Sequence, residues 1–286
     1  ASIYWNGLRV FGFFRHPTLY LEGYARYVCN GNQEVLNQEL LGKTLSDDHQ
    51  NDDQDAHKCS SPANLWYCLP PREEKWQENI GIELNCEEAE YLRDRIVKSE
   101  YSKNSLLAFM LKSDHKTVRT IARFENIGNL LDIPANINEV YNMAKRFSDF
   151  IYGANLRYNI ILTNRQNKKT LELWDNWNNS FFVKQSFTDY DTNEAMDYLA
   201  INNPRLRRFL HQWKEYFLLK DEEAMDELII KREIELKNRD RAKLGNPEYH
   251  KSGDSGVLVG GKLNFRFNNV YHLLDDIFTG LELTHA

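Results

Sequence analysis

Apolar side chains recur at helical spacing along most of the 286-residue chain, and the clearest run follows Pro134. Over residues 137–162 the apolar positions hold one face of a helix for about seven turns. Asn136, with Glu139 three residues later, predicts a cap at the start of this helix. Gly153 lies inside the helix at a cost of about 1 kcal/mol relative to alanine. Close packing of another helix against this glycine is the simplest explanation.

Two more amphipathic helices are predicted in the C-terminal half. Asn203-Pro204 joins an N-cap residue to a proline at the first helical position, ahead of a single apolar stripe. The polar side chains outside that stripe are Arg205, Arg208 and Gln212. A second helix is predicted from about Asp221 to Leu244, because Gly245-Asn246-Pro247 is a typical C-terminal stop.

Shorter elements complete the pattern. Further helices are predicted at residues 17–29, 85–96, 106–111, 170–187 and 271–281. The apolar segment 3–14 fits either a buried extended segment or a short helix. Alternating Leu263, Phe265 and Phe267 predict a short strand. We interpret the tryptophan-rich 170–187 segment as core rather than as a base-stacking platform.

These elements predict a mainly α fold, a multi-helix globular bundle of about eight helices with a few short strands. For this length we expect one compact unit made of an N-terminal lobe, residues 1–133, and a C-terminal lobe, residues 134–286. The acidic, aperiodic segment at about 43–63 is predicted to be a disordered surface insertion. It lacks the ligand spacing of a calcium-binding loop.

Composition adds limits on partners and location. Hydrophobic residues make up 42% of the chain and aromatic residues 13%, which is enough for a real core. A formal charge of −6 and a pI of about 5.8 exclude a global positive field for nucleic acid or an anionic membrane. Because neither a long apolar run nor a signal peptide is found, we predict a cytoplasmic protein that binds no membrane. Ala1 is not expected to be the native start.

The four cysteines are predicted to be free and reduced. Cys29, Cys59, Cys68 and Cys86 contain no CxxC pair, and a chain of this size does not need a disulfide framework. His57 and Cys59, with Cys68 and Cys86 downstream, could be drawn as a zinc site, but the spacing fits no compact zinc knuckle. We therefore expect neither a metal nor any other cofactor.

No motif identifies a reaction. The tetrapeptide Gly253-Asp254-Ser255-Gly256 is similar to the one that holds the nucleophile of chymotrypsin-type proteases, but that chemistry needs an oriented histidine on a β scaffold. A flexible turn is the better interpretation. Phosphate-binding loop, kinase, flavin and metalloprotease signatures are absent from the sequence. Catalytic residues are therefore unknown, and whether the protein is an enzyme stays uncertain.

A local basic region is the best candidate site. Between residues 228 and 266 nine lysines and arginines oppose five acidic residues. The candidate residues for binding an anion or a nucleic acid are Arg239, Arg241, Lys243 and Arg266. The glycine-rich loop nearby would allow backbone amides to approach a phosphate. In the competing interpretation Arg239 pairs with Glu235, the other charges are solvated, and Gly260-Gly261 only turns the chain.

Several segments, taken in order, carry a family resemblance. They are SIYWNGL (2–8), EEAEYLRDRI (87–96), SLLAFML (105–111), FSDFIYGANLRYNIIL (147–162), REIELKNRDRAKLGN (232–246), LNFRF (263–267) and LLDDIFTGLE (273–282). The chain resembles an uncharacterised bacterial family defined only as a domain of unknown function, and it corresponds to about the C-terminal two-thirds of its members. The resemblance implies gene neighbourhoods of anti-phage defence. It carries over no catalytic residue, and the acidic segment departs from the family pattern.

Two functional hypotheses follow. The first is a non-catalytic accessory or scaffolding subunit of a multi-gene, defence-type system, with other proteins of the same gene cluster as partners. The alternative is a protein that binds or processes nucleic acid through the basic C-terminal helix and the glycine-rich loop, with a DNA or RNA backbone as partner. A sensor of a small ligand in the aromatic core is a third interpretation.

Overall fold

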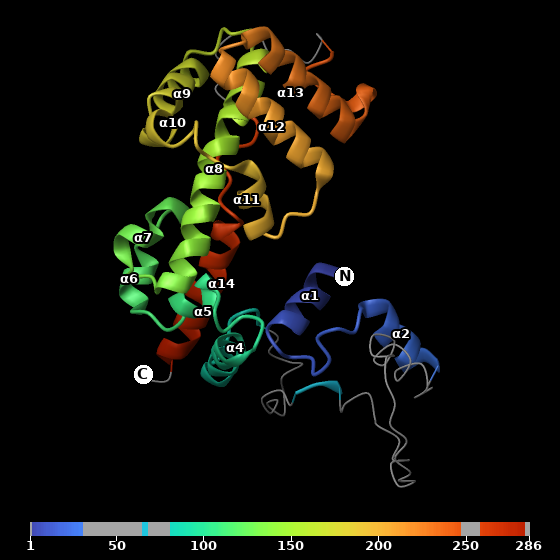
Figure 1. The fold of residues 1–286 in the computed structure, drawn as a ribbon. Helices are drawn as coiled ribbons and strands as arrows, with labels where there is room; N and C mark the ends of the chain where they lie inside the picture. Colours follow the sequence, from blue (N-terminus) through green and yellow to red (C-terminus); the bar gives the residue numbers. More distant parts are fainter. Residues whose placement is uncertain (1, 31–64, 68–80, 247–257, 284–286) are drawn as a thin grey trace, which may run out of the picture. The chain divides into compact units, whose positions relative to one another are not determined.

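The computed structural model describes residues 2–30, 65–67, 81–246 and 258–283 (Figure 1). The mainly α fold predicted from the sequence is confirmed, because helices account for the regular structure throughout these ranges. No β-strand occurs in them, and a single isolated bridge joins Phe14 to Trp66. The acidic segment at 43–63 and Gly253-Asp254-Ser255-Gly256 lie outside the described residues.

The chain divides into two units. Unit 1 contains residues 1–122 and 269–286, and unit 2 contains residues 123–268. Compared with the predicted lobes 1–133 and 134–286, residues 123–133 group with the second unit and the last helix groups with the first.

Unit 1 is built from short helices. They are α1 (Ser2–Val10), α2 (Leu21–Asn30), α4 (Cys86–Lys98), α5 (Leu106–Met110), α6 (His115–Arg119) and most of α14 (Phe267–Glu282). The segment for which the sequence allowed two interpretations is thus a helix, α1. The capping box at the start of α4 is confirmed, with Glu88 N donating to Asn85 Oδ1 at 2.9 Å and Asn85 N to Glu88 Oε2 at 3.1 Å. Gly280 lets α14 approach Ala89 of α4.

Unit 2 is organised around α8 (Ala135–Leu162), the long green helix of Figure 1. This helix contacts α9 (Lys168–Asn178), α10 (Phe181–Gln185), α11 (Thr192–Tyr198) and α13 (Glu222–Lys237). The remaining helical elements of the unit are η2 (Phe124–Asn126), α7 (Ile127–Leu130), α12 (Pro204–Leu219) and η3 (Arg239–Arg241). The predicted cap at Asn136 is wrong, because the helix already begins at Ala135.

The core of unit 2 is aromatic, as predicted for its tryptophan-rich segment, although Phe181 of that segment is 79% exposed. A Cβ on Gly153 would lie 2.2 Å from the Trp177 ring, so the glycine is there because the ring packs on the α8 backbone. The Trp177 Nε1–H also donates to Asp149 O at 2.8 Å. The single helix expected over 170–187 is two helices, α9 and α10, because Ser180 caps a new helix.

Two other predicted boundaries are wrong for tertiary reasons. The strand over 263–267 does not form, because Phe265 and Arg266 adopt left-handed φ values of 51° and 59° and turn the chain into α14. The helix expected to end near Leu244 stops at Lys237. Asn238, with φ of 63°, there leads into the 3-10 turn of η3.

Candidate functional site

Helices α12 and α13 form a hairpin (Figure 1). Asn203 caps α12 by accepting from Leu206 N at 3.0 Å, and Asp221 caps α13 by accepting from Ala224 N at 3.0 Å. The two residues between the helices include Lys220, whose left-handed conformation reverses the chain. The two helices therefore run antiparallel, and residues far apart in sequence face each other.

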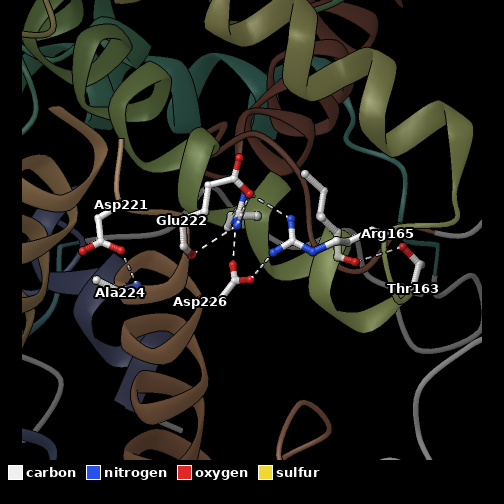
Figure 2. A network of polar contacts seen from close by, with 8 residues as sticks. Thr163, Arg165, Asp221, Glu222, Ala224 and Asp226 are labelled. Atoms are coloured by element: carbon white, nitrogen blue, oxygen red, sulfur yellow. Dashed lines mark hydrogen bonds and ion pairs between the residues drawn. The ribbon is translucent and has the colours of Figure 1, made fainter. Parts of the chain in front are cut away.

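A network of four charged side chains fixes this hairpin to α8. Arg157 of α8 is 2% exposed, and its guanidinium donates to Asp226 and, at 3.0 Å, to Glu222 Oε2. Arg165 lies opposite the same two carboxylates, 3.0 Å from Glu222 and 2.6 Å from Asp226 (Figure 2). Hydrogen bonds from Arg157 and then Arg165 hold the pKa of Glu222 below its ordinary value. Each charge has its partner, so this network positions helices and offers no open charge.

A buried carboxylate fixes the other end of α13. Glu233 is 5% exposed and accepts from Tyr158 Oη at 2.8 Å, Lys237 Nζ at 2.9 Å and Leu244 N at 2.8 Å. Burial alone would raise the pKa of Glu233, but these donors together hold it below its ordinary value. The bond to Leu244 N requires the chain to fold back, which explains why α13 ends early.

A basic groove of about 660 Å³ lies between α12 and α13. Its walls are positive or polar, and its lining residues are Arg205, Arg208, Phe209, Gln212, Leu228, Lys231, Arg232 and Glu235. The α12 residues are spaced by three or four positions, and so are those of α13, so each helix turns one face to the groove. Phe209 and Leu228 are buried and supply an apolar base.

Most cations of this groove have no counter-charge from the residues that the structure describes. Glu235 is the one acidic residue in the lining, and it lies 3.6 Å from Arg232. The Arg232 guanidinium is placed over the Phe209 ring, 5.6 Å from its centroid. Among the described residues, no carboxylate lies within ion-pair distance of Arg205, Arg208 or Lys231. An acidic chain thus presents a local positive surface with free donors.

The four residues predicted as an anion site lie on two segments of unit 2. Arg239 and Arg241 are exposed on η3, and Lys243 is half-buried just after it. Arg266 is exposed in the turn before α14, and its backbone N–H donates to Asn264 Oδ1 at 3.1 Å. The predicted Glu235–Arg239 pair is not formed there either, since Glu235 pairs with Arg232.

The described end of the glycine-rich loop is held by asparagines of α8. Val259 N donates to Asn159 Oδ1 at 2.8 Å, and Val259 O accepts from Asn159 Nδ2 at 3.0 Å. Gly260 has φ of +75°, and a Cβ there would lie 2.6 Å from Asn155 Nδ2. The backbone of Val259 is therefore committed to α8, and Gly260 permits that close approach.

The groove residues were visible in the sequence only in part. Three groove residues lie outside the apolar stripe of their helix: Arg205, Arg208 and Gln212. This position indicates that they are exposed, but it does not indicate which side chains they face. Lys231 and Arg232 gave no separate signal, because they belong to a charge-alternating helix. Only two residues separate the two capped helices α12 and α13, and this short link is the sequence feature that could have predicted that their polar faces lie side by side.

Comparisons with known proteins add no relative. Protein-family models, curated proteins and solved structures all give no significant match. In the described residues, no group of three or more His, Cys, Asp or Glu side chains could hold a metal ion. Cys29 is exposed and Cys86 half-buried, while His57, Cys59 and Cys68 lie outside these ranges. None of the described helices is both long and apolar enough to cross a membrane.

Proposed function

We propose that this protein is a helical, non-catalytic accessory protein that binds the phosphate backbone of a nucleic acid in the groove between α12 and α13. The observation that carries the proposal is the convergence of Arg205, Arg208 and Lys231, none of which has a carboxylate partner in the described ranges. Where exposed cations serve only the solubility of a protein, acidic side chains are interspersed among them. Here one acid faces four cations.

The chemistry of the groove favours the backbone over the bases. Arginine and lysine bind phosphate oxygens irrespective of sequence, and the Gln212 amide can add a neutral hydrogen bond. The one aromatic ring in the lining, Phe209, is 8% exposed and lies beneath Arg232, so it offers no face for stacking a base. Binding is therefore expected to depend on salt and only weakly on sequence.

The wider role is supported by the resemblance described above. We propose on this basis that the chain works in a bacterial, cytoplasmic, multi-gene system of the anti-phage defence type, with partner proteins encoded in the same gene cluster. The fully paired networks on α8 and α13 are consistent with a structural framework. In such a system the groove would hold nucleic acid for a partner that performs the chemistry.

Fluorescence anisotropy with single- and double-stranded probes at several salt concentrations tests the proposal. Lys231→Gln is expected to weaken binding similarly for all sequences and to lower the salt dependence by about one unit per lost phosphate contact. Lys169→Gln is the matched control, because Lys169 is an exposed lysine of α9 outside the groove. Wild-type protein that fails to bind either probe above background at low salt would refute the proposal.

The same assay decides between the groove and the cluster expected from sequence. Arg241→Ala and Arg266→Ala remove exposed cations outside the groove lining, so we expect them to have less effect than Lys231→Gln. If these two variants lose binding and Lys231→Gln does not, the interface lies at η3 and the turn before α14.

A further inference from the structure

A second concentration of arginines lies in unit 1, in a pocket of about 270 Å³. The pocket lies between α4 and the segment that follows α1. Its charged lining residues are Arg9, Arg15, Arg95, Lys98 and Glu100. Tyr67 forms part of its wall. The pocket is smaller than the groove, and its lining does not come from two facing helices.

Among the described residues, the three arginines of this pocket have no carboxylate partner. Lys98 pairs with Asp94, and Glu100 pairs with Lys103 at 2.5 Å, so the acid in the lining is already neutralised. Within the described ranges no acidic side chain reaches ion-pair distance of Arg9, Arg15 or Arg95. Three cations thus converge on a confined space, and none of them forms an ion pair within the described part of the chain.

Contacts with rings and carbonyl groups hold the arginines in place. The guanidinium carbons of Arg95 and Arg15 lie 4.0 Å and 4.9 Å from the centroid of the same Tyr67 ring. Arg95 also donates to Gly12 O, while its Nε is buried and has no acceptor. Arg9 donates through Nε to Pro17 O, which leaves its terminal NH₂ groups available. Such preorganised guanidinium groups lose little side-chain entropy on binding.

Gly12 makes this arrangement possible. Its φ is +72°, and a Cβ there would lie 2.9 Å from Arg95 Nη2. The Ser99 hydroxyl donates to Val10 O at 2.6 Å and fastens the segment after α1 to α4. The arginines therefore come from two segments of unit 1 that are tied together, and they do not depend on the groove of unit 2.

We propose that this pocket binds a phosphate-monoester group. Two guanidinium groups on one aromatic ring repel each other, and a bound dianion removes that repulsion. The planar fork of arginine matches phosphate oxygens. The volume admits one phosphate with a small attached group and is too small for a nucleic-acid duplex. The ligand is either a free phosphorylated small molecule, such as a nucleotide, or the 5′-phosphate end of a nucleic-acid strand.

Isothermal titration calorimetry on the full chain tests this site. The probes are inorganic phosphate, AMP, and a short oligonucleotide with either a 5′-phosphate or a 5′-hydroxyl group. Arg15→Gln is expected to weaken phosphate and AMP binding about tenfold, the loss of one charge-assisted contact. Arg93→Gln is the matched control, since Arg93 lies on α4 outside the pocket and pairs with Asp94. Lys169→Gln, at an exposed lysine outside both the pocket and the groove, should leave AMP binding unchanged.

The oligonucleotide pair identifies the source of the phosphate. Tighter binding of the 5′-phosphate oligonucleotide than of its 5′-hydroxyl counterpart assigns the pocket to strand ends, and equal binding of the two oligonucleotides assigns it to free small molecules. Absence of phosphate and AMP binding at about 10 mM, or equal losses in Arg15→Gln and Arg93→Gln, overturns the proposal. If Arg15→Gln unfolds the protein, Arg15→Lys replaces it. That variant keeps the charge but loses the fork, and we expect a smaller loss of the same sign.

Discussion

Unit 2 contains two sets of basic side chains that differ in one respect, whether an acid faces them. Arg157 and Arg165 face two carboxylates of α13, and every charge in that set is paired. Figure 2 shows Arg165 with Glu222 and Asp226. Arg205 and Arg208 face other cations across the groove and have no carboxylate partner among the described residues. The paired set joins α8 to α13, while the unpaired set is available to a ligand.

The comparison separates stability from binding. Removing one member of a buried, paired set leaves an uncompensated charge, which destabilises the fold. Removing an exposed, unpaired cation leaves nothing unsatisfied and relieves repulsion between like charges. Substitutions in the first set should therefore lower the free energy of unfolding, and substitutions in the second should lower affinity alone.

The largest effect is expected for Arg157→Met. It removes the buried guanidinium that Asp226 and Glu222 share, and we expect the free energy of unfolding to fall by about 3 kcal/mol. Urea denaturation followed by circular dichroism measures it. Arg165→Met is the control, because Arg165 is half-exposed and should cost less than about 1 kcal/mol. Equal losses of unfolding free energy in Arg157→Met and Arg165→Met would show that burial of the guanidinium does not determine the size of the loss.

Glu233→Gln is expected to have the next largest effect. At pH 7 the free energy of unfolding should fall by about 2 kcal/mol, because three donors lose a charged acceptor. Glu235→Gln on the same helix is the control, since its carboxylate is exposed and has one distant partner.

The pH dependence of the Glu233 effect has a definite sign. The pKa of Glu233 in the folded protein lies below its ordinary value of 4.5, so the carboxylate stabilises the fold above that pH. This contribution is lost as the pH falls through the lowered pKa. The difference between wild type and Glu233→Gln should therefore be full at pH 6 to 7 and shrink below about pH 4.5. A difference that stays constant down to pH 3 would contradict this assignment.

Gln212→Glu should have the smallest effect on stability. It tests the unpaired set of cations instead of the paired set. It places a carboxylate among the unpaired cations of the groove, so it should weaken nucleic-acid binding several-fold. The melting temperature should stay nearly unchanged, because a surface substitution of this kind alters stability by less than about 0.5 kcal/mol. Anisotropy and a thermal melt on the same sample measure both quantities. Unchanged affinity would argue that the groove is not the interface.

Much of the fold could be predicted because helix signals are local. The capping box at Asn85, the Asn203-Pro204 start and the Asp221 start all appear where the sequence placed them. The packing on Gly153 was also predicted, because a glycine within a strong helix needs a reason. For the candidate site, the sequence predicted only that the C-terminal region is locally rich in basic residues. Which cations meet depends on residues far apart in sequence.

The sequence by itself determined that the chain is helical, where most helices start, and that its positive charge is local. Those properties depend on residues within about four positions of each other. Only the tertiary structure decided where α13 ends and what its charges face. Glu233 binds Leu244 N because burial leaves that carboxylate no water, and this long-range demand overrides the helix signal that continues past Lys237. Lys231 joins Arg205 and Arg208 in one groove because a two-residue turn folds α13 back on α12.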